Sequence, residues 1–183
     1  MPQVYQPEED SFLLQKTLEE KLPKLLKEKP LLKFLEIGSG SGIHLKTALS
    51  LGIKNQNIFS CDINKDAIMH CKKLGFNCIK SNLFKKVKSK YDIIIFNPPY
   101  LPENPLEPKD SKLATTGGKY GSEVINNFLK QAKSHLTKNG TIFLLTSSLT
   151  KKTNWQDYKK KKISTKKIFF EELYVWEVKL PLA

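Results

Sequence analysis

The chain has 183 residues, of which 39% are hydrophobic and 27% are charged, and its formal net charge is +13. This length and composition are typical of a globular protein with one substantial core, so we expect a single domain over residues 1–183. The sequence has no run of about 18 apolar residues, and its first ten residues lack the basic and apolar regions of a signal peptide. We therefore expect a cytoplasmic protein that does not enter a membrane.

All 31 basic residues are lysine, and the chain has no arginine. Arginine is the side chain best suited to paired contacts with phosphates and guanines, so the positive charge alone does not predict nucleic-acid binding. Two interpretations of the lysine-rich segment 151–167, which contains the run Lys159–Lys162, stay open. It is either a solvated face, which we favour, or a binding surface.

The first 30 residues predict a helical section. Pro7 and the acidic residues at 8–10 favour a helix that starts near Gln6, because acids stabilise the positive end of the helix dipole. Leucines at helical spacing follow, with a break predicted at Pro23, and Pro30 ends the section.

Residues 31–97 alternate between strand and helix patterns. Apolar runs of strand length occur at 31–37, 57–63, 76–81 and 91–97. Helical patterns separate the first three of them, at 43–51 and at 64–74, and Asn64 is the predicted cap of the second helix. This alternation predicts an α/β fold with a parallel sheet.

The second half continues the pattern and then departs from it. An amphipathic helix is predicted at 122–136, closed by the turn residues Asn139–Gly140, and a strand follows at 141–148. Residues 161–180 predict two strands joined near Glu171–Glu172. No helix separates these two strands, so we expect them to pair antiparallel.

The first strand ends in Glu36 and runs into the glycine-rich segment 38–42, and an acid, Asp62, ends the second strand. Glycines at this position allow a tight turn and the close approach of a ligand, and an acid after the second strand can accept hydrogen bonds from a ribose. The glycine spacing differs from the dinucleotide fingerprint, and Glu36 would repel phosphates while accepting an ammonium. A positively charged nucleoside without phosphates fits, which indicates S-adenosylmethionine.

Three further motifs support this interpretation: "VYQPEEDSFLL" at the N-terminus, "NPPYLP" after the fourth strand, and "GGKYG". Together with the pattern ExGxGxG they resemble class I S-adenosylmethionine-dependent methyltransferases. More narrowly, they resemble the short HemK-type protein-glutamine methyltransferases of archaea and eukaryotes. The resemblance implies a Rossmann-like, mostly parallel seven-stranded sheet with helices on both faces and an antiparallel C-terminal strand. It also implies that residues 1–30 cover the cofactor site.

The resemblance assigns S-adenosylmethionine, with S-adenosylhomocysteine as product, to a defined set of residues. The residues that it implies for cofactor binding are Tyr5, Ser11, Glu36, Gly38, Gly40, Asp62, Asn82, Leu83 and Asn97. Where the family usually has Asp-Leu against the adenine, this chain has Asn82-Leu83, so the acceptor there is uncharged.

The catalytic residues are predicted in the turn Asn97–Tyr100. The side-chain oxygen of Asn97 and the carbonyl of Pro98 can hold both hydrogens of an NH2 group and direct its lone pair at the methyl carbon. Pro98 and Pro99 stiffen the turn and remove competing N–H donors, while Tyr100 can pack on the flat amide. The alternative is an ordinary turn at the end of a strand.

The resemblance implies that the substrate is the glutamine of the Gly-Gly-Gln motif of a class I translation release factor. Gly117 and Gly118 are expected beside the active site, in a loop that lets the substrate backbone approach, with Asn97 and Tyr100 also contacting substrate. Three alternatives stay open: a nucleic-acid amino-methyltransferase, a protein-lysine methyltransferase and an inactive methyltransferase-like scaffold. Nucleic acid is not required by the main interpretation.

No metal site is predicted, because the spacing of Cys61, His70, Cys71 and Cys78 matches no usual ligand pattern. The three cysteines are expected to be buried thiols. The histidines at 44, 70 and 135 are expected to be surface or packing residues without a role in the chemistry.

A partner is expected at the strand 76–80, which the family's strand order places at one edge of the sheet. Phe76, Cys78 and Ile79 would leave apolar groups on an unpaired edge, and such an edge invites another chain. The resemblance implies a small zinc-containing activator protein that extends the sheet by one strand. The alternative is a self-sufficient monomer in which Lys72, Lys73 and Lys80 protect the edge.

Overall fold

A computed structural model describes residues 4–106, 108 and 114–181 of the chain. Its helices are α1 (Glu9–Glu28), α2 (Ile43–Ser50), the short 3₁₀ helix η1 (Asn55–Asn57), α3 (Lys65–Lys73) and α5 (Glu123–His135). Its strands are β1 (Phe34–Ile37), β2 (Ile58–Asp62), β3 (Asn77–Lys80), β4 (Tyr91–Phe96), β5 (Leu101–Pro102), β6 (Thr116–Gly118), β7 (Leu136–Ser147), β8 (Lys159–Ile168) and β9 (Glu171–Lys179).

Seven of these strands form one sheet in the order β3-β2-β1-β4-β7-β9-β8. The pairs from β3 to β7 are parallel, whereas β9 runs antiparallel to both of its neighbours, β7 and β8. The predicted seven-stranded, mostly parallel sheet with an antiparallel C-terminal strand is therefore confirmed. Strands β5 and β6 form a separate two-stranded sheet beside the end of β4.

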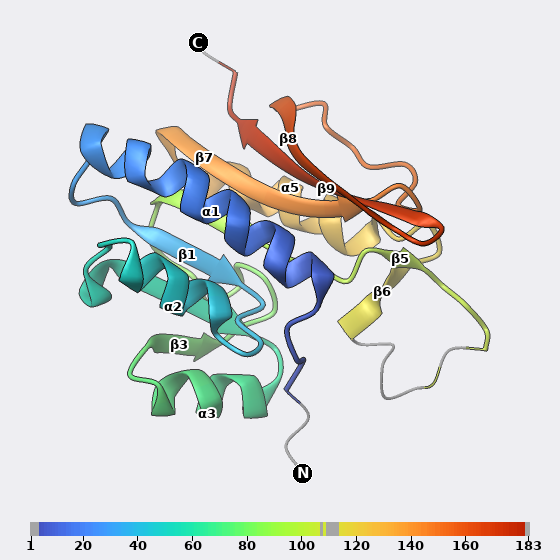
Figure 1. Ribbon diagram of the computed structural model, residues 1–183, viewed down its shortest axis with the longest axis horizontal. Helices are drawn as coiled ribbons and strands as arrows, with labels where there is room; N and C mark the ends of the chain where they lie inside the picture. Colours follow the sequence, from blue (N-terminus) through green and yellow to red (C-terminus); the bar gives the residue numbers. More distant parts are fainter. Residues whose placement is uncertain (1–3, 107, 109–113, 182–183) are drawn as a thin grey trace.

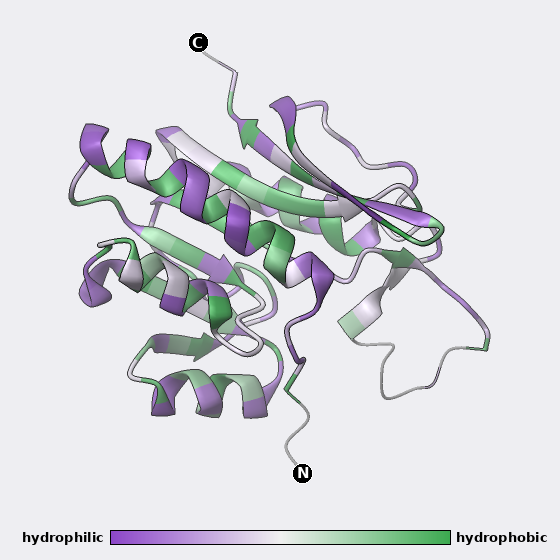
Figure 2. Cartoon of the chain, viewed as in Figure 1, coloured by the Kyte–Doolittle hydropathy of each residue, from purple (hydrophilic) through white to green (hydrophobic). Residues whose placement is uncertain are grey.

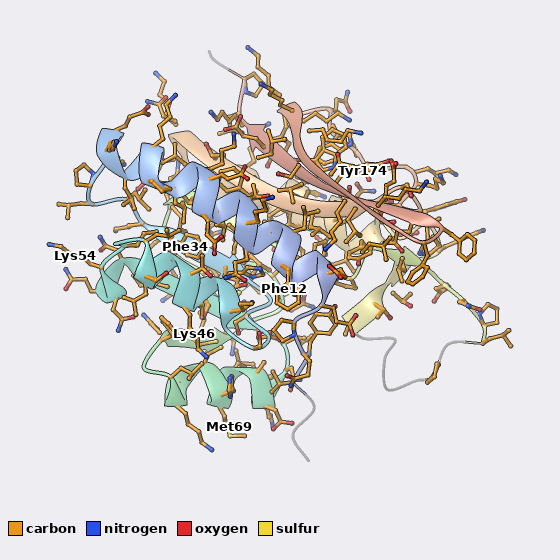
Figure 3. All side chains as sticks on the ribbon, in the orientation of Figure 1. Phe12, Phe34, Lys46, Lys54, Met69 and Tyr174 are labelled. Carbon is orange, nitrogen blue, oxygen red and sulfur yellow. The ribbon has the colours of Figure 1, made fainter. Side chains whose placement is uncertain are left out.

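Helices cover both faces of the large sheet (Figure 1). One hydrophobic cluster lies on the side of α1, α2 and α3, and a second lies on the side of α5. Every residue of β1 and β4 is buried, as expected for central strands that are covered on both faces. Phe34, labelled in Figure 3, begins β1 and belongs to the cluster beneath α1 and α2.

Helix α1 differs from its prediction at both the start and the middle. It begins at Glu9 rather than near Gln6, so Pro7 precedes it, and Pro23 lies inside the helix without ending it. Hydrophobic and hydrophilic residues alternate along α1 (Figure 2), and Leu14, Leu18 and Leu22 are fully buried against the sheet. Burial of this apolar stripe on both sides of Pro23 outweighs the backbone hydrogen bond that the proline removes.

Strand β7 begins earlier than predicted, directly after α5. Asn139–Gly140 lies within the strand and does not close the helix. The pairing with β4 jumps from Tyr91–Leu136 to Ile93–Thr141, so the residues between form a bulge that accommodates the turn-forming pair. The β8–β9 hairpin likewise turns at Phe169 and Phe170, two residues before the predicted position.

Strand β3 is at the edge of the sheet, as predicted, and pairs only with β2. The prediction that Phe76 adds an apolar group to this edge is wrong. Phe76 precedes the strand, is 6% exposed and belongs to the core on the α1 side. Cys78 is buried as well, which leaves Ile79, 37% exposed, as the large apolar side chain that β3 presents to solvent.

Within the described residues, no helix has the length and apolar character needed to cross a bilayer.

Candidate active site

The predicted site residues follow the carboxyl ends of β1, β2 and β4, three neighbouring strands of the sheet. Parallel strands end at the same edge, and ligands of α/β folds bind in the crevice beyond that edge. Glu36 lies near the end of β1, Asp62 ends β2, and Asn97 directly follows β4. The topology therefore brings the predicted cofactor and catalytic residues together.

The glycine-rich turn after β1 wraps around the carboxylate of Asp62. Gly38, Gly40 and Gly42 all have positive φ angles, between 45° and 73°, a conformation that favours glycine. The backbone N–H of Gly40 donates to Asp62 Oδ2 at 3.0 Å, and that of Asn64 donates to Oδ1 at 2.8 Å. These contacts hold the carboxylate in place, and each oxygen keeps further capacity for a ribose hydroxyl.

Glu36 is buried and is held by a histidine. His44 Nδ1 lies 2.7 Å from Glu36 Oε1, and His44 Nε2 lies 3.0 Å from the carbonyl of Ser11. Burial disfavours the charged imidazole, but the charge of Glu36 and the two hydrogen bonds outweigh it and raise the pKa of His44. The prediction that His44 is a surface or packing residue is therefore wrong: it connects β1, α2 and α1 at the site.

The second oxygen of Glu36 is a buried atom without a hydrogen-bond partner in the described structure. Buried polar atoms in folded proteins are almost always paired, so an unpaired carboxylate oxygen indicates a missing donor. The ammonium of a positively charged amino acid is such a donor. The residues present therefore fit the amino-acid end of S-adenosylmethionine.

The N-terminal segment contributes an acid that sequence reasoning did not assign to the site. Asp10 is 5% exposed and accepts hydrogen bonds from the Tyr5 hydroxyl at 3.1 Å and from the Tyr100 hydroxyl at 3.4 Å. Burial and then the charge of Asp10 raise the pKa of both tyrosines, so the hydroxyls remain donors. The contact between Asp10 and the distant Tyr100 left no signal in the sequence beyond the position of Asp10 near the helix start.

Asn97 presents the feature that its predicted role requires. Its side-chain oxygen, Oδ1, is buried and has no hydrogen-bond partner in the described structure. An acceptor kept dry and unpaired at the end of a strand costs free energy unless a ligand supplies the donor. The position matches that of an acceptor for a substrate NH2 group.

The glycine loop predicted to face the substrate packs directly on the turn that follows Asn97. A Cβ added to Gly117 would lie 2.6 Å from the carbonyl oxygen of Pro99, and one added to Gly121 would lie 2.3 Å from that of Tyr100. Thr150 Oγ1 also donates to the Tyr100 carbonyl at 2.9 Å. Two loops thus contact the turn, and Gly118 packs against the side chain of Glu123.

Glu171, the first residue of β9, is another site residue that the sequence did not indicate. Its Oε1 is buried without a hydrogen-bond partner in the described structure. Burial raises its pKa, the hydroxyl of Ser147 opposes the rise, and the charge of Asp10 adds to it. The charge of Glu171 also helps to raise the pKa of Tyr100, after burial and Asp10, so this carboxyl lies near the same turn.

Asn82 and Leu83 follow β3 and adjoin the same edge. The N–H of Ser81 donates to the carbonyl of Asp62 at 2.9 Å, which places this segment beside the second strand. Leu83 is buried with a φ of 49°, whereas Asn82 is exposed. The Asn82 side chain is therefore accessible to a ligand at this edge, and its role with the adenine stays a prediction.

The cysteines are buried and unpaired, as predicted. Cys71 and Cys78 lie next to the glycine turn: Cys78 Sγ is 3.4 Å from Ser39 Oγ, and Cys71 Sγ is 3.7 Å from the Gly40 carbonyl oxygen. In the part of the chain that the structure describes, no three metal-binding side chains gather into a site.

Residues 11–158 match the methyltransferase small domain family. A protein of Methanocaldococcus jannaschii named for protein N5-glutamine methyltransferase activity is 38% identical over 157 residues, which cover 81% of this chain and 75% of that protein. The human methyltransferase HEMK2 is 32% identical, covering 78% of this chain and 71% of its own length. The catalytic subunit mtq2 of the Schizosaccharomyces pombe eRF1 methyltransferase is 33% identical, with the same two coverages.

Among solved structures, the Mtq2–Trm112 complex of E. cuniculi superposes with a TM-score of 0.73 at 22% identity, covering 97% of this chain and 99% of the matched chain. This similarity and the glycine turn at the strand ends define the fold as that of a class I methyltransferase. The chain belongs to the methyltransferase small domain family and, within it, to the short HemK-type protein methyltransferases.

Proposed function

We propose that this chain transfers a methyl group from S-adenosylmethionine to the side-chain amide nitrogen of a glutamine, the one in the Gly-Gly-Gln motif of a class I translation release factor. The observation that carries the proposal is the buried, unpaired oxygen of Asn97. The names of the relatives from Methanocaldococcus and fission yeast, which refer to glutamine and to a termination factor, support the substrate.

The residues around β1 and β2 would hold the cofactor. Glu36 offers its free oxygen to the ammonium, Gly38 and Gly40 allow close approach of the ligand to the backbone, and Asp62 faces the ribose. S-adenosylmethionine, when bound, supplies a methyl group that is already electrophilic because it is attached to a sulfonium. The protein therefore does not have to activate the methyl donor. It has to align the substrate nitrogen with the methyl carbon and stabilise the charge that develops during transfer.

The turn after β4 would align the amide. Asn97 Oδ1 and the carbonyl of Pro98 each accept one hydrogen of the substrate NH2 group, which fixes the plane of the amide. As the nitrogen forms its new bond it gains positive character, so both hydrogen bonds strengthen in the transition state. Pro98 and Pro99 keep the two acceptors at a constant separation because their φ angles are restricted.

Tyr100 would cover one face of the amide. The residue is restrained at two points. Its hydroxyl donates a hydrogen bond to Asp10, and its backbone carbonyl accepts one from Thr150. A ring restrained in this way can exclude water from the amide without losing rotational freedom on binding. Gly117 and Gly118 let their loop pack closely beside this turn, because a Cβ on Gly117 would meet the Pro99 carbonyl and one on Gly118 would meet the Glu123 side chain. Their contact with the substrate backbone stays a prediction.

A partner protein at the β3 edge is also part of the proposal. The solved relative is a complex of Mtq2 with Trm112, and we propose that a comparable small protein, zinc-containing by family resemblance, adds a strand to β3. The edge is unpaired, and a hollow of about 220 Å³ lined by Asn77, Ile79 and Phe59 adjoins it. This hollow could receive an apolar side chain of the partner.

The test is a methyl-transfer assay with labelled S-adenosylmethionine, in which the cognate release factor is compared with total RNA and with a lysine-rich protein. Mass spectrometry is expected to place one added methyl group on the glutamine of the release factor. Asn97→Ala, which should retain cofactor binding, is the negative control. Methylation of RNA or of lysine in place of glutamine would overturn the proposal.

A further inference from the structure

A groove of about 400 Å³ lies beside the proposed active site, on the face of the β7–β9–β8 sheet that α5 also covers. Its walls include Lys152, Trp155, Lys160, Tyr174 and Trp176, together with the end of β7. Tyr174 is labelled on the β8–β9 ribbon in Figure 3. Nothing in the proposed chemistry uses this groove.

The groove adjoins the catalytic turn through shared residues. Thr150 and Ser147 line it, and Thr150 is the residue whose hydroxyl holds the Tyr100 carbonyl at 2.9 Å. Ser147 is also the partner of the Glu171 carboxyl. A chain that places a glutamine at Asn97 therefore passes close to the entrance of the groove.

Two exposed lysines of β8 lie over aromatic rings here: Lys160, which lines the groove, and Lys162, which adjoins it. Lys160 Nζ lies 4.6 Å from the ring centre of Trp155 and 4.8 Å from that of Trp176. Lys162 Nζ lies 4.0 Å from the ring centre of Tyr174. The favoured sequence interpretation, a solvated lysine face, agrees with the exposure of all four residues of the run Lys159–Lys162. Lys160 and Lys162 in addition lie over aromatic rings, whereas Lys159 and Lys161 lie on the opposite side of the strand.

These ammonium groups have no counter-ion in the described structure. Neither Lys152 nor Lys160 nor Lys162 lies within ion-pair distance of a described carboxylate. The nearby Glu172 instead accepts the Tyr174 hydroxyl at 2.9 Å. Partial burial beside the rings lowers the pKa of Lys160. A negatively charged ligand would supply the counter-ion.

The rings also indicate which kind of anion fits. Single-stranded nucleic acids bind by stacking bases on open aromatic faces. Here Trp155, Tyr174 and Trp176 each have a lysine of the same chain over the ring. A lysine ammonium pairs with a carboxylate as a point charge, and a ring covered by an ammonium is less open to a stacking base. The groove therefore favours carboxylates over a nucleic acid.

From this geometry we infer that the groove binds an acidic segment of the protein substrate, close in space to the glutamine that is methylated. The inference rests on the proposed function, since it assumes a protein that lies along the catalytic turn. Lys152 and Lys160, which line the groove, and Lys162, which lies beside it over Tyr174, contact the carboxylates. The groove supplies ground-state affinity and selects substrates, and it takes no part in the transfer.

The test compares two substrate peptides that share Gly-Gly-Gln, one with acidic flanks and one in which each flanking Asp or Glu is replaced by Asn or Gln. The double variant Lys160→Gln/Lys162→Gln keeps most of the side-chain bulk over the rings. Its matched control, Lys159→Gln/Lys161→Gln, removes the same charge from the other side of β8. The thermal midpoint of both proteins shows whether they fold equally well, and Lys152→Gln provides a second, single test.

We expect the groove variant to raise KM for the acidic peptide by about tenfold with kcat unchanged, the signature of lost ground-state binding. The control variant and the neutral peptide should show no such change. Raising the salt to about 0.5 M should remove most of the difference, because exposed charges are screened. Equal KM values for the groove and control variants would overturn the inference.

Two further outcomes separate this inference from the proposed function. If the wild type methylates neither peptide, binding can be measured without catalysis, by calorimetry with acidic and neutral peptides that carry Gly-Gly-Asn. Loss of acidic-peptide binding in the groove variant would then support the inferred role of the groove. If the groove variant instead loses binding of a single-stranded RNA oligonucleotide while its KM for the acidic peptide is unchanged, the groove is a nucleic-acid site and the inference is overturned.

Discussion

His44 Nδ1 lies 2.7 Å from one oxygen of the Glu36 carboxylate, while the other oxygen is equally buried and has no partner. The histidine thereby holds one oxygen of the carboxylate and leaves the other available to the proposed cofactor. A carboxylate that binds an ammonium has to be positioned before the ligand arrives, since reorganisation would reduce the affinity. We therefore propose that His44 positions Glu36 for the cofactor.

Replacing His44 with alanine should weaken S-adenosylmethionine binding by about 1–2 kcal/mol, because Glu36 is left buried with neither oxygen oriented. Asp62→Ala, which removes the proposed ribose acceptor, should cost about 1–3 kcal/mol. Titration calorimetry measures both. His70→Ala, a change on the partly exposed side of α3, is the control, and equal affinities of the His44 and His70 variants would remove His44 from the site.

Asn97→Ala should separate binding from chemistry. The substitution removes the unpaired acceptor, so methyl transfer should fall by at least about a hundredfold, the scale for losing one positioned polar group in an active site. Cofactor affinity should stay close to that of the wild type. Asn104→Ala, in the exposed loop downstream, serves as the control in the same single-turnover assay. A folded Asn97→Ala enzyme with normal turnover would refute the alignment mechanism.

Glu171→Gln and Glu171→Ala test the second unpaired oxygen near the turn. If Oε1 accepts a hydrogen bond from the substrate, the alanine variant should raise KM for the glutamine peptide by about fivefold to tenfold. The glutamine variant, which keeps an oxygen acceptor, should lose less. Glu172→Ala on the same strand is the comparison. Identical KM values for all of these variants would show that Glu171 has a structural role alone.

Asp92 links α1 to the sheet and provides a prediction about pH. Its carboxylate accepts from Lys29 Nζ at 2.6 Å, from the Lys33 N–H at 2.9 Å and from Thr137 Oγ1 at 2.8 Å. Burial alone would raise its pKa, but these donors outweigh burial and lower it. The stabilisation is therefore fully present above the unfolded-state pKa of about 3.9 and is lost as the pH falls through the lower folded-state value.

Asp92→Asn should accordingly lower the free energy of unfolding by about 1–3 kcal/mol at neutral pH, and the difference from wild type should shrink below about pH 4. Urea unfolding at a series of pH values measures this. Asp157→Asn breaks an exposed ion pair with Lys133 and should change stability by less than about 1 kcal/mol. A pH-independent loss in the Asp92 variant would contradict the assignment of its lowered pKa.

Ile79→Glu tests the proposed partner edge. A charge on the exposed side chain of β3 should weaken a heterodimer with the activator and leave the fold intact, because Ile79 is 37% exposed. Phe76 is unsuitable for this test, since a charge in its buried position would unfold the protein. Leu31→Glu, at a 62% exposed position before β1, is the control in co-purification and size-exclusion runs. Equal heterodimer formation by both variants would place the partner elsewhere.

Local patterns in the sequence were sufficient to predict the order of the main helices and strands, the glycine turn and the asparagine that follows β4. Each of these depends on a few consecutive residues: apolar runs that have to be buried, glycines that tolerate positive φ, and prolines that restrict a turn. Boundaries were less predictable. Pro23 lies inside α1 because the packing of Leu18 and Leu22 on the sheet outweighs the helix-breaking effect of the proline. Asn139–Gly140 lies in a bulge of β7 and does not end α5.

The long-range contacts between side chains at and beside the site were decided by tertiary structure alone. Asp10 meets Tyr100 across 90 positions of the chain, and Glu171 reaches the catalytic turn only because β9 inserts antiparallel beside β7. Lys160 covers Trp176 for the same reason, since the β8–β9 pairing sets which lysines of the run face the rings. Hydrogen bonds and charge contacts act over a few ångströms, so their partners depend on how the elements pack, and residue spacing along the chain does not specify them.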